Sequence, residues 1–161
     1  MSQGPSVTLR AVAPDDGDFL RELYASTRTE ELARTGWSDE QKAAFLNQQF
    51  TAQTQHYAAH YSAADYRIIL ACGQRAGRLI ILRMEKESRV VDIALLPEYR
   101  GQGIGTALLK NLLRDAAAEG RCVTIHVEKF NPAVRLYQHL GFKPAEDKGV
   151  YWFMKWTAGQ A

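Results

Sequence analysis

Residues 95–109 read LLPEYRGQGIGTALL, so that an apolar strand runs through a glycine-rich turn directly into a helix. Gly101, Gly103 and Gly105 allow the backbone to turn sharply and to expose its amide groups. The first amides of the helix, together with the helix dipole, favour an anion at this point. The segment therefore predicts a site for a pyrophosphate, although the same glycines could serve only as a tight connection between a strand and a helix.

The residues next to this turn favour the binding interpretation. Arg100 places a permanent positive charge at the entrance to the turn. The predicted helix over residues 103–120 carries an apolar stripe at helical spacing, which would pack it on a sheet. The stripe consists of Ile104, Leu108, Leu109, Leu112 and Leu113.

Farther from the turn, alternating and helical patterns predict the other elements. We expect strands at residues 7–12, 66–72, 78–84, 89–96, 122–127, 143–146 and 150–156. Capping residues and apolar spacing predict further helices. These helices run from the signal at residues 14–16 to about residue 27, from residue 38 to residue 61, and from residue 132 to about residue 140.

The order of these elements decides the fold class. Three consecutive strands between residues 66 and 96 are joined by short turns and indicate an antiparallel meander. The only strand–helix–strand crossover lies between residues 89 and 127, beside the glycine-rich turn. We therefore predict a mixed α/β (α+β) fold for one domain over residues 1–161, with helices flanking a mostly antiparallel sheet that contains one parallel pair.

A second motif follows the glycine-rich turn. Residues 131–137 read NPAVRLY, and residues 140–142 read LGF. Together with Arg100, Gly103 and Gly105, this motif closely resembles the GNAT superfamily of N-acetyltransferases, whose signature is Arg or Gln, two residues, Gly, one residue, and Gly or Ala. The order and the distance of the two motifs also match that family.

The resemblance implies that acetyl-CoA is the acyl donor and that its pyrophosphate binds the amides of the glycine-rich turn. Pantetheine would pair with the edge of the preceding strand, as an added strand pairs with a sheet. In the family, the strands on either side of the cofactor separate to admit the thioester. The donor-binding residues implied in this way are Ile93, Leu95, Arg100, Gly101, Gln102, Gly103, Ile104, Gly105, Thr106, Asn131 and Tyr137.

Acetyl transfer to an amine needs a base for the amine proton and an acid for the departing thiolate. Tyr137 matches the family position whose hydroxyl meets the sulfur, so it is the candidate acid, although it could be a core aromatic. His126 and Glu128 are the candidate bases, and His126 could equally be structural. Asp92 is a further candidate, but its apolar neighbours favour a paired structural carboxylate.

The predicted early helices carry candidate residues for the acceptor site and for a metal site. His56 and His60 have a spacing that zinc can use, but no Glu follows His56 in an HExxH pattern, so we predict no metal. The resemblance implies that these helices line the acceptor site, with Trp37, Phe45 and Tyr57 as candidate lining residues. The acceptor itself could be a small molecule or a protein amine.

Composition argues against several other partners. The net charge is +2 from 20 basic and 18 acidic side chains that are interspersed, which does not indicate nucleic acid. No apolar stretch is long enough for a membrane span, and the first residues do not resemble a secretory signal. Cys72 and Cys122 fall in apolar runs that favour reduced core thiols. We therefore expect a cytoplasmic protein that binds no membrane.

Two other interpretations use the same turn. An NAD-dependent oxidoreductase would need GxGxxG and further strand–helix units, but the chain has GxGxG and only a short helix and a hairpin after Glu128. A non-catalytic acyl-CoA sensor would keep the turn and could dispense with Tyr137. The aromatic residues of the final hairpin could form a homodimer or complete the monomer's core.

Overall fold

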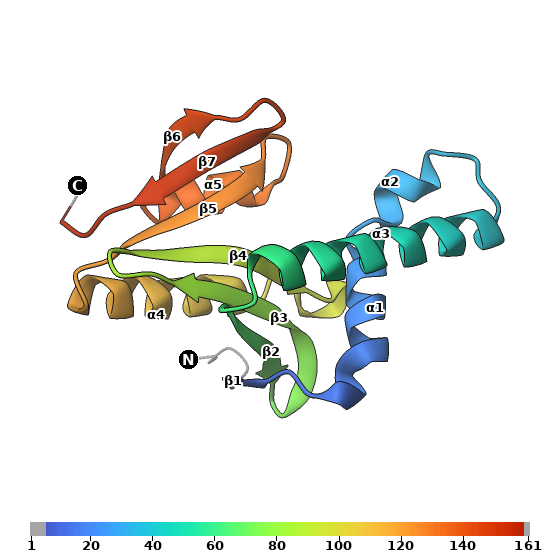
Figure 1. The fold of residues 1–161 in the computed structure, drawn as a ribbon, viewed down its shortest axis with the longest axis horizontal. Coiled ribbons are helices and arrows are strands. Elements are labelled where there is room, and N and C mark those ends of the chain that lie inside the picture. Colours follow the sequence, from blue (N-terminus) through green and yellow to red (C-terminus); the bar gives the residue numbers. More distant parts are fainter. Residues whose placement is uncertain (1–5, 160–161) are drawn as a thin grey trace.

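A computed structural model of the chain describes residues 6–159, which form one sheet with helices on both faces (Figure 1). The strand order is β1-β2-β3-β4-β5-β7-β6. The strands are β1 (Val7–Ala11), β2 (Asp65–Ala71), β3 (Gln74–Arg83), β4 (Glu87–Leu95), β5 (Cys122–Glu128), β6 (Lys143–Asp147) and β7 (Tyr151–Trp156). The helices are α1 (Gly17–Ser26), α2 (Thr29–Ala33), α3 (Asp39–His60), α4 (Ile104–Ala118) and α5 (Ala133–His139), with short 3-10 turns η1 (Pro14–Asp16) and η2 (Pro97–Tyr99).

The pairing of the strands confirms the predicted fold class. β1 to β4 form an antiparallel meander, and β5, β7 and β6 continue the sheet in antiparallel fashion. β4 and β5 run parallel, because α4 carries the chain back across the sheet between them. The crossover therefore places the start of α4 at the end of β4, where the glycine-rich turn lies.

The larger hydrophobic core lies between the sheet and α4. Ile104, Leu109 and Leu113 from the predicted apolar stripe are buried there against Val90 and Val123. Complete burial of one such aliphatic side chain contributes about 1.5–3 kcal/mol relative to exposure. The start of α4 is consequently fixed on the sheet by its own first residue.

Helices α1 and α3 lie on the opposite face of the sheet from α4 (Figure 1). Phe19 and Leu23 of α1 are buried against Ile68 and Leu96 in a second, smaller core cluster. α3 has a full capping box at Ser38, but none of its residues is buried. Its N-terminal half extends beyond the sheet together with α2, so its predicted apolar face is only partly covered.

One helix was missed, and one local expectation was wrong. The short helix α2 was not anticipated, because five residues give too little periodicity to identify a helix. Cys72 is exposed rather than buried: β2 ends at Ala71, and Cys72 (φ 51°) and Gly73 (φ 80°) form the tight turn to β3. Positive φ at both central residues is typical of a type I′ hairpin turn. Cys122 is partly buried at the start of β5, and both cysteines are free thiols.

The aromatic residues of β7 are partly buried or exposed: Trp152, Phe153 and Trp156 are partly buried, and Tyr151 is 41% exposed. Trp152 and Trp156 pack against the larger core between the sheet and α4, and Met154 is fully buried.

Among the helices of residues 6–159, none has the length and apolar character needed to cross a membrane.

Candidate active site

The sheet opens between β4 and β5, its two parallel strands. They pair from Glu87 opposite Cys122 to Val90 opposite Ile125, and no pair follows, although both strands continue. Within β4, the register against β3 shifts so that Val91 has no partner there. An irregularity of this kind bends a strand away from its neighbour. The gap between the strands therefore leaves the edge of β4 beyond Val90 unpaired on its β5 side.

The glycine-rich turn lies at the end of that free edge. Gly101 (φ 75°) and Gly103 (φ 81°) have left-handed backbone conformations, and Gly103 caps the start of α4. The amides of residues 101–106 donate no hydrogen bond to any acceptor in residues 6–159. Consecutive free amides in such a turn, at the positive end of a helix, form a concave site for an anion.

Two side chains of the turn stabilise it through hydrogen bonds to backbone carbonyls. The Arg100 Nε donates to the Leu95 carbonyl at 3.0 Å, and the Gln102 Nε2 donates to the Glu98 carbonyl at 2.8 Å. Arg100 is exposed, so its charge contributes to the field at the turn while its side chain holds the end of β4. A Cβ atom at Gly101 or Gly103 would meet nothing within 4 Å. The space over the turn is therefore open to a ligand.

Tyr137 lies on α5 and is 5% exposed, with its ring edge-on to Phe142 at 5.8 Å. Burial raises the pKa of Tyr137 to about 12, and the negative charge of Asp92 on β4 contributes to the increase. The phenol therefore stays protonated at every physiological pH. The N-terminus of α5 is organised by Asn131, whose Oδ1 accepts from the Ala133 amide at 2.9 Å.

Asp92 is paired, as the structural interpretation of this residue expects. The Arg78 guanidinium donates to one Asp92 oxygen through Nη2 at 2.8 Å and through Nε at 3.1 Å. Arg78 also donates to Gln53 of α3 at 3.1 Å and lies over the ring of Tyr57. These contacts engage the carboxylate and attach α3 to the sheet.

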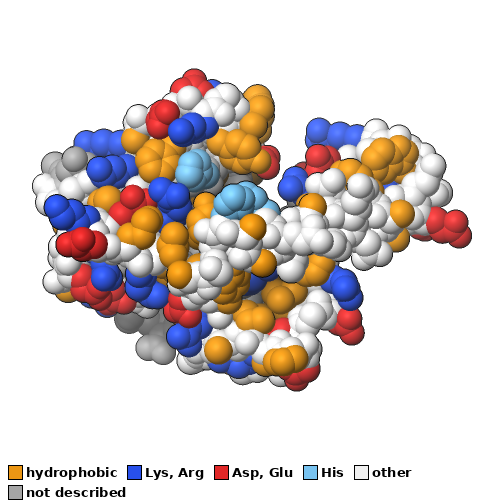
Figure 2. Space-filling view, in the orientation of Figure 1, with side chains coloured by type: hydrophobic (Ala, Val, Ile, Leu, Met, Phe, Trp, Pro, Cys, Tyr) orange, Lys and Arg blue, Asp and Glu red, His pale blue; other side chains and the backbone are white. Residues whose placement is uncertain are grey.

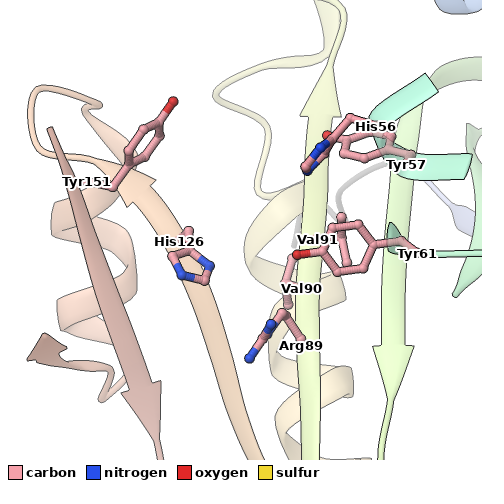
Figure 3. Close-up of a pocket in the computed structure, with 8 residues that line it drawn as sticks. All are labelled: His56, Tyr57, Tyr61, Arg89, Val90, Val91, His126 and Tyr151. Carbon is pink, nitrogen blue, oxygen red and sulfur yellow. The ribbon is translucent and has the colours of Figure 1, made fainter. Parts of the chain in front are cut away.

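A cavity of about 260 Å³ lies beside the gap, on the face of the sheet that carries α3 (Figure 3). It is lined by His56, Tyr57, Tyr61, Arg89, Val90, Val91, His126 and Tyr151. Figure 3 shows His126 and Tyr151 on one side, and the α3 residues with Val91 on the other. In Figure 2 this face is hollowed between the β6–β7 hairpin and the arm formed by α2 and α3, with histidine side chains beside the hollow.

Of the predicted catalytic residues, His126 is the one that lines this cavity. Its ring lies 4.8 Å from that of Phe153. Partial burial lowers the pKa of His126 below its usual value, and the positive charges of Arg89 and Lys148 lower it further. The imidazole is therefore neutral at physiological pH and able to accept a proton.

The other predicted residues are divided between the cavity and its surroundings. Tyr57 lines the cavity, whereas Trp37 and Phe45 pack against each other with ring centroids 5.3 Å apart and do not line it. Glu128 is exposed at the end of β5 and is likewise outside the lining. Sequence reasoning did not identify Arg89 and Tyr151, although the alternation of β4 could have placed Arg89 on the face opposite Val90.

Metal binding finds no support in the described structure. His56 and His60 lie with ring centroids 4.5 Å apart, but no group of three or more His, Cys, Asp or Glu residues within residues 6–159 is arranged to hold a metal ion.

Comparison with known proteins identifies relatives that match part of the chain. The chain is 39% identical over 71 residues to an N-alpha-acetyltransferase of Saccharolobus solfataricus, covering 41% of this chain and 42% of that protein. It is 38% identical over 66 residues to the chloroplastic GCN5-related N-acetyltransferase 2 of Arabidopsis thaliana, covering 40% of this chain and 25% of that protein. The chain thus matches less than half the length of either relative.

Solved structures share the whole fold. The PaiA N-acetyltransferase of Thermoplasma acidophilum, crystallised in complex with coenzyme A, superposes with a TM-score of 0.71 at 17% identity, over 94% of this chain and 99% of that chain. Residues 55–144, more than half of the 161 residues, match the sequence profile of the family described as "Acetyltransferase (GNAT) domain". The chain therefore belongs to the GNAT acetyltransferases, a family that uses acetyl-CoA as its donor.

Proposed function

We propose that this chain is an N-acetyltransferase that passes the acetyl group of acetyl-CoA directly to a primary amine held in the cavity beside His126. The observation that carries this proposal is the run of free amides at residues 101–106, which lies at the end of an unpaired strand edge leading to the cavity. The free amides at one end of the strand edge suit a diphosphate, and the cavity at the other end suits an amine acceptor.

The donor would bind along β4. The free amides of the glycine-rich turn would hold the pyrophosphate, and the edge from Ile93 to Leu95 would pair with the pantetheine chain. The Asn131 Oδ1 accepts from the Ala133 amide, which leaves the side-chain nitrogen of Asn131 available to the donor. This arrangement would bring the thioester to the gap between β4 and β5.

The proton acceptor would be His126. The amine must lose a proton as its nitrogen attacks the thioester carbonyl, and a neutral imidazole within the cavity suits that task. Glu128 does not line the cavity, so it would act only through water or a change of position. We therefore assign the base to His126.

The proton donor would be Tyr137. With a pKa of about 12, it is a weaker acid than an ordinary thiol, whose pKa is about 8.5. A thiolate that departs into the same buried region also has a raised pKa, so the difference narrows. In the proposed step the N–C bond forms and the C–S bond breaks, His126 takes the amine proton, and the Tyr137 hydroxyl gives its proton to the sulfur.

Release of free thiol from acetyl-CoA, measured over a panel of amines with mass detection of the products, tests this function. We expect release that depends on an amine and an N-acetylated product. Tight binding of acetyl-CoA without release for any amine would instead favour a non-catalytic acyl-CoA sensor.

A further inference from the structure

The lining of the cavity beside His126 is positively charged, although an amine acceptor is itself a cation when protonated. The single permanent charge of the lining is the cation of Arg89, and none of the lining residues is Asp or Glu. Most of the other lining is aromatic: Tyr57, Tyr61 and Tyr151, with His56. A site for a polyamine would need carboxylates to offset the additional positive charges of its ligand.

Arg89 is held in place with part of its guanidinium unused. Its Nε and Nη2 both donate to Oε2 of Glu87, at 3.2 Å and 3.0 Å, and the Thr124 hydroxyl donates to the same carboxylate oxygen. Its Nη1 donates to no acceptor in residues 6–159. The Arg89 side chain is 26% exposed, and its guanidinium lies 5.9 Å from the ring centre of Phe153.

Arg89 lines the same cavity as the proposed base, His126. Figure 3 shows Arg89 projecting from β4 on the side that faces the strand carrying His126. A guanidinium fork recognises a carboxylate through two parallel N–H bonds when both are free, and through one charge-assisted bond when the other edge is occupied. Arg89 is therefore fixed as a receptor for one anionic group close to where an amine would react.

We propose that the acceptor is a small amine that carries a carboxylate, namely a free α-amino acid with an apolar or aromatic side chain. This inference rests on the proposed function. The carboxylate binds Arg89, the α-amino group next to it lies beside His126, and the side chain contacts the tyrosine rings. The cavity volume of about 260 Å³ is slightly below the roughly 300 Å³ at which pockets for drug-sized ligands begin, so it suits a smaller ligand such as an amino acid.

Three matched amines separate this acceptor class from its alternatives: L-phenylalanine, its amide, and 2-phenylethylamine. The amide resembles a peptide N-terminus, and the third compound lacks the carboxyl carbon. One charge-assisted hydrogen bond predicts kcat/KM for phenylalanine about 10- to 100-fold above that of the other two. The same comparison with leucine and its analogues, and with spermidine, tests the requirement for the carboxylate in general.

Variants of Arg89 give the second arm of the experiment. Arg89→Gln should remove the advantage of the amino acid over its amide. The double variant Glu87→Gln/Arg89→Gln should do the same without leaving a carboxylate unpaired, so it serves if the single variant fails to fold. Arg114→Gln, which removes an exposed arginine from α4, is the charge-matched control and should keep the advantage.

The outcomes distinguish this inference from the proposed function. If acetyl-CoA binds and the amide or 2-phenylethylamine reacts as well as phenylalanine, the carboxylate assignment is overturned while the acetyltransferase remains. Acetylation of no free amino acid, with turnover of another amine, overturns it too. If acetyl-CoA itself is not bound, the proposed function fails.

Discussion

The backbone conformation at Gly103 allows a quantitative prediction that separates folding from donor binding. Its φ of 81° is left-handed, and an alanine there would meet no atom within 4 Å. The cost of Gly103→Ala is therefore backbone strain alone, about 1–2 kcal/mol. If the turn relaxes to relieve this strain, the donor must restore its geometry on binding. We expect the Kd for CoA to rise about 5- to 30-fold.

Gly105 is the matched control in the same turn. It lies within α4 with ordinary helical φ, and a Cβ atom there would also meet nothing within 4 Å. Gly105→Ala should stabilise the protein by about 0.5–1 kcal/mol, because alanine is the better helix former. The GNAT signature accepts Gly or Ala at this position, so the Kd for CoA should change by no more than about twofold.

Urea unfolding and isothermal calorimetry with CoA measure the two effects independently. If the turn of Gly103→Ala keeps its conformation, we expect the strain to appear as lost stability, and if the turn relaxes, we expect it to appear as lost CoA affinity. Gly105→Ala should lose neither. A Gly103→Ala protein that loses neither stability nor CoA affinity would contradict the left-handed conformation at this position, and one that relaxes yet binds CoA with unchanged Kd would refute the role of this conformation in donor binding.

Three further perturbations test other parts of the site and the fold. Tyr137→Phe should lower kcat by about 100-fold with an unchanged Kd for CoA, and a kinetically silent variant would remove the acid role. Because the pKa of His126 is lowered, kcat/KM of the wild-type protein should fall only below about pH 6.5, where His126 becomes protonated. His126→Gln should remove this fall from the pH profile of kcat/KM. If the variant still shows the fall, another group is the base. Asp16 is fully buried against Arg10 and Arg75, and the Arg10 hydrogen bonds hold its pKa well below the usual range. The ionised carboxylate of Asp16 therefore contributes fully to the free energy of unfolding above about pH 3.9, and this contribution is lost as the pH falls further. Asp16→Asn should lower the free energy of urea unfolding at pH 7 by about 2 kcal/mol. A change near zero would contradict the pairing with Arg10 and Arg75.

Much of the fold could be predicted because local patterns and topology agree. The stripe from Ile104 to Leu113 fixes α4 as a helix packed on the sheet, and the crossover it forms requires the parallel pair. α3 was correctly placed by the capping residue Ser38 and the apolar spacing, but its weak burial was not foreseen. Burial depends on what lies opposite a helix, and half of α3 projects beyond the sheet.

The site could be predicted in part. The sequence predicted a sharp turn at the glycines, and Gly101 and Gly103 have the positive φ that glycine adopts without strain, whereas Gly105 does not. The presence of Arg89 and Tyr151 in the cavity depends on how far β4 and β5 separate and on β7 lying beyond β5, which no local pattern encodes. The cytoplasmic location and a homodimer through the final hairpin stay predictions.

The central claim is that free amides at the start of α4 hold the diphosphate of the donor. Calorimetric titration with acetyl-CoA, compared with S-acetylpantetheine at the same concentrations, tests it most directly, because the second compound lacks the diphosphate and the nucleoside. We expect measurable binding of acetyl-CoA and much weaker binding of S-acetylpantetheine, which keeps only the contacts with the edge of β4. Equal affinity for the two compounds, or no heat with acetyl-CoA, would contradict it.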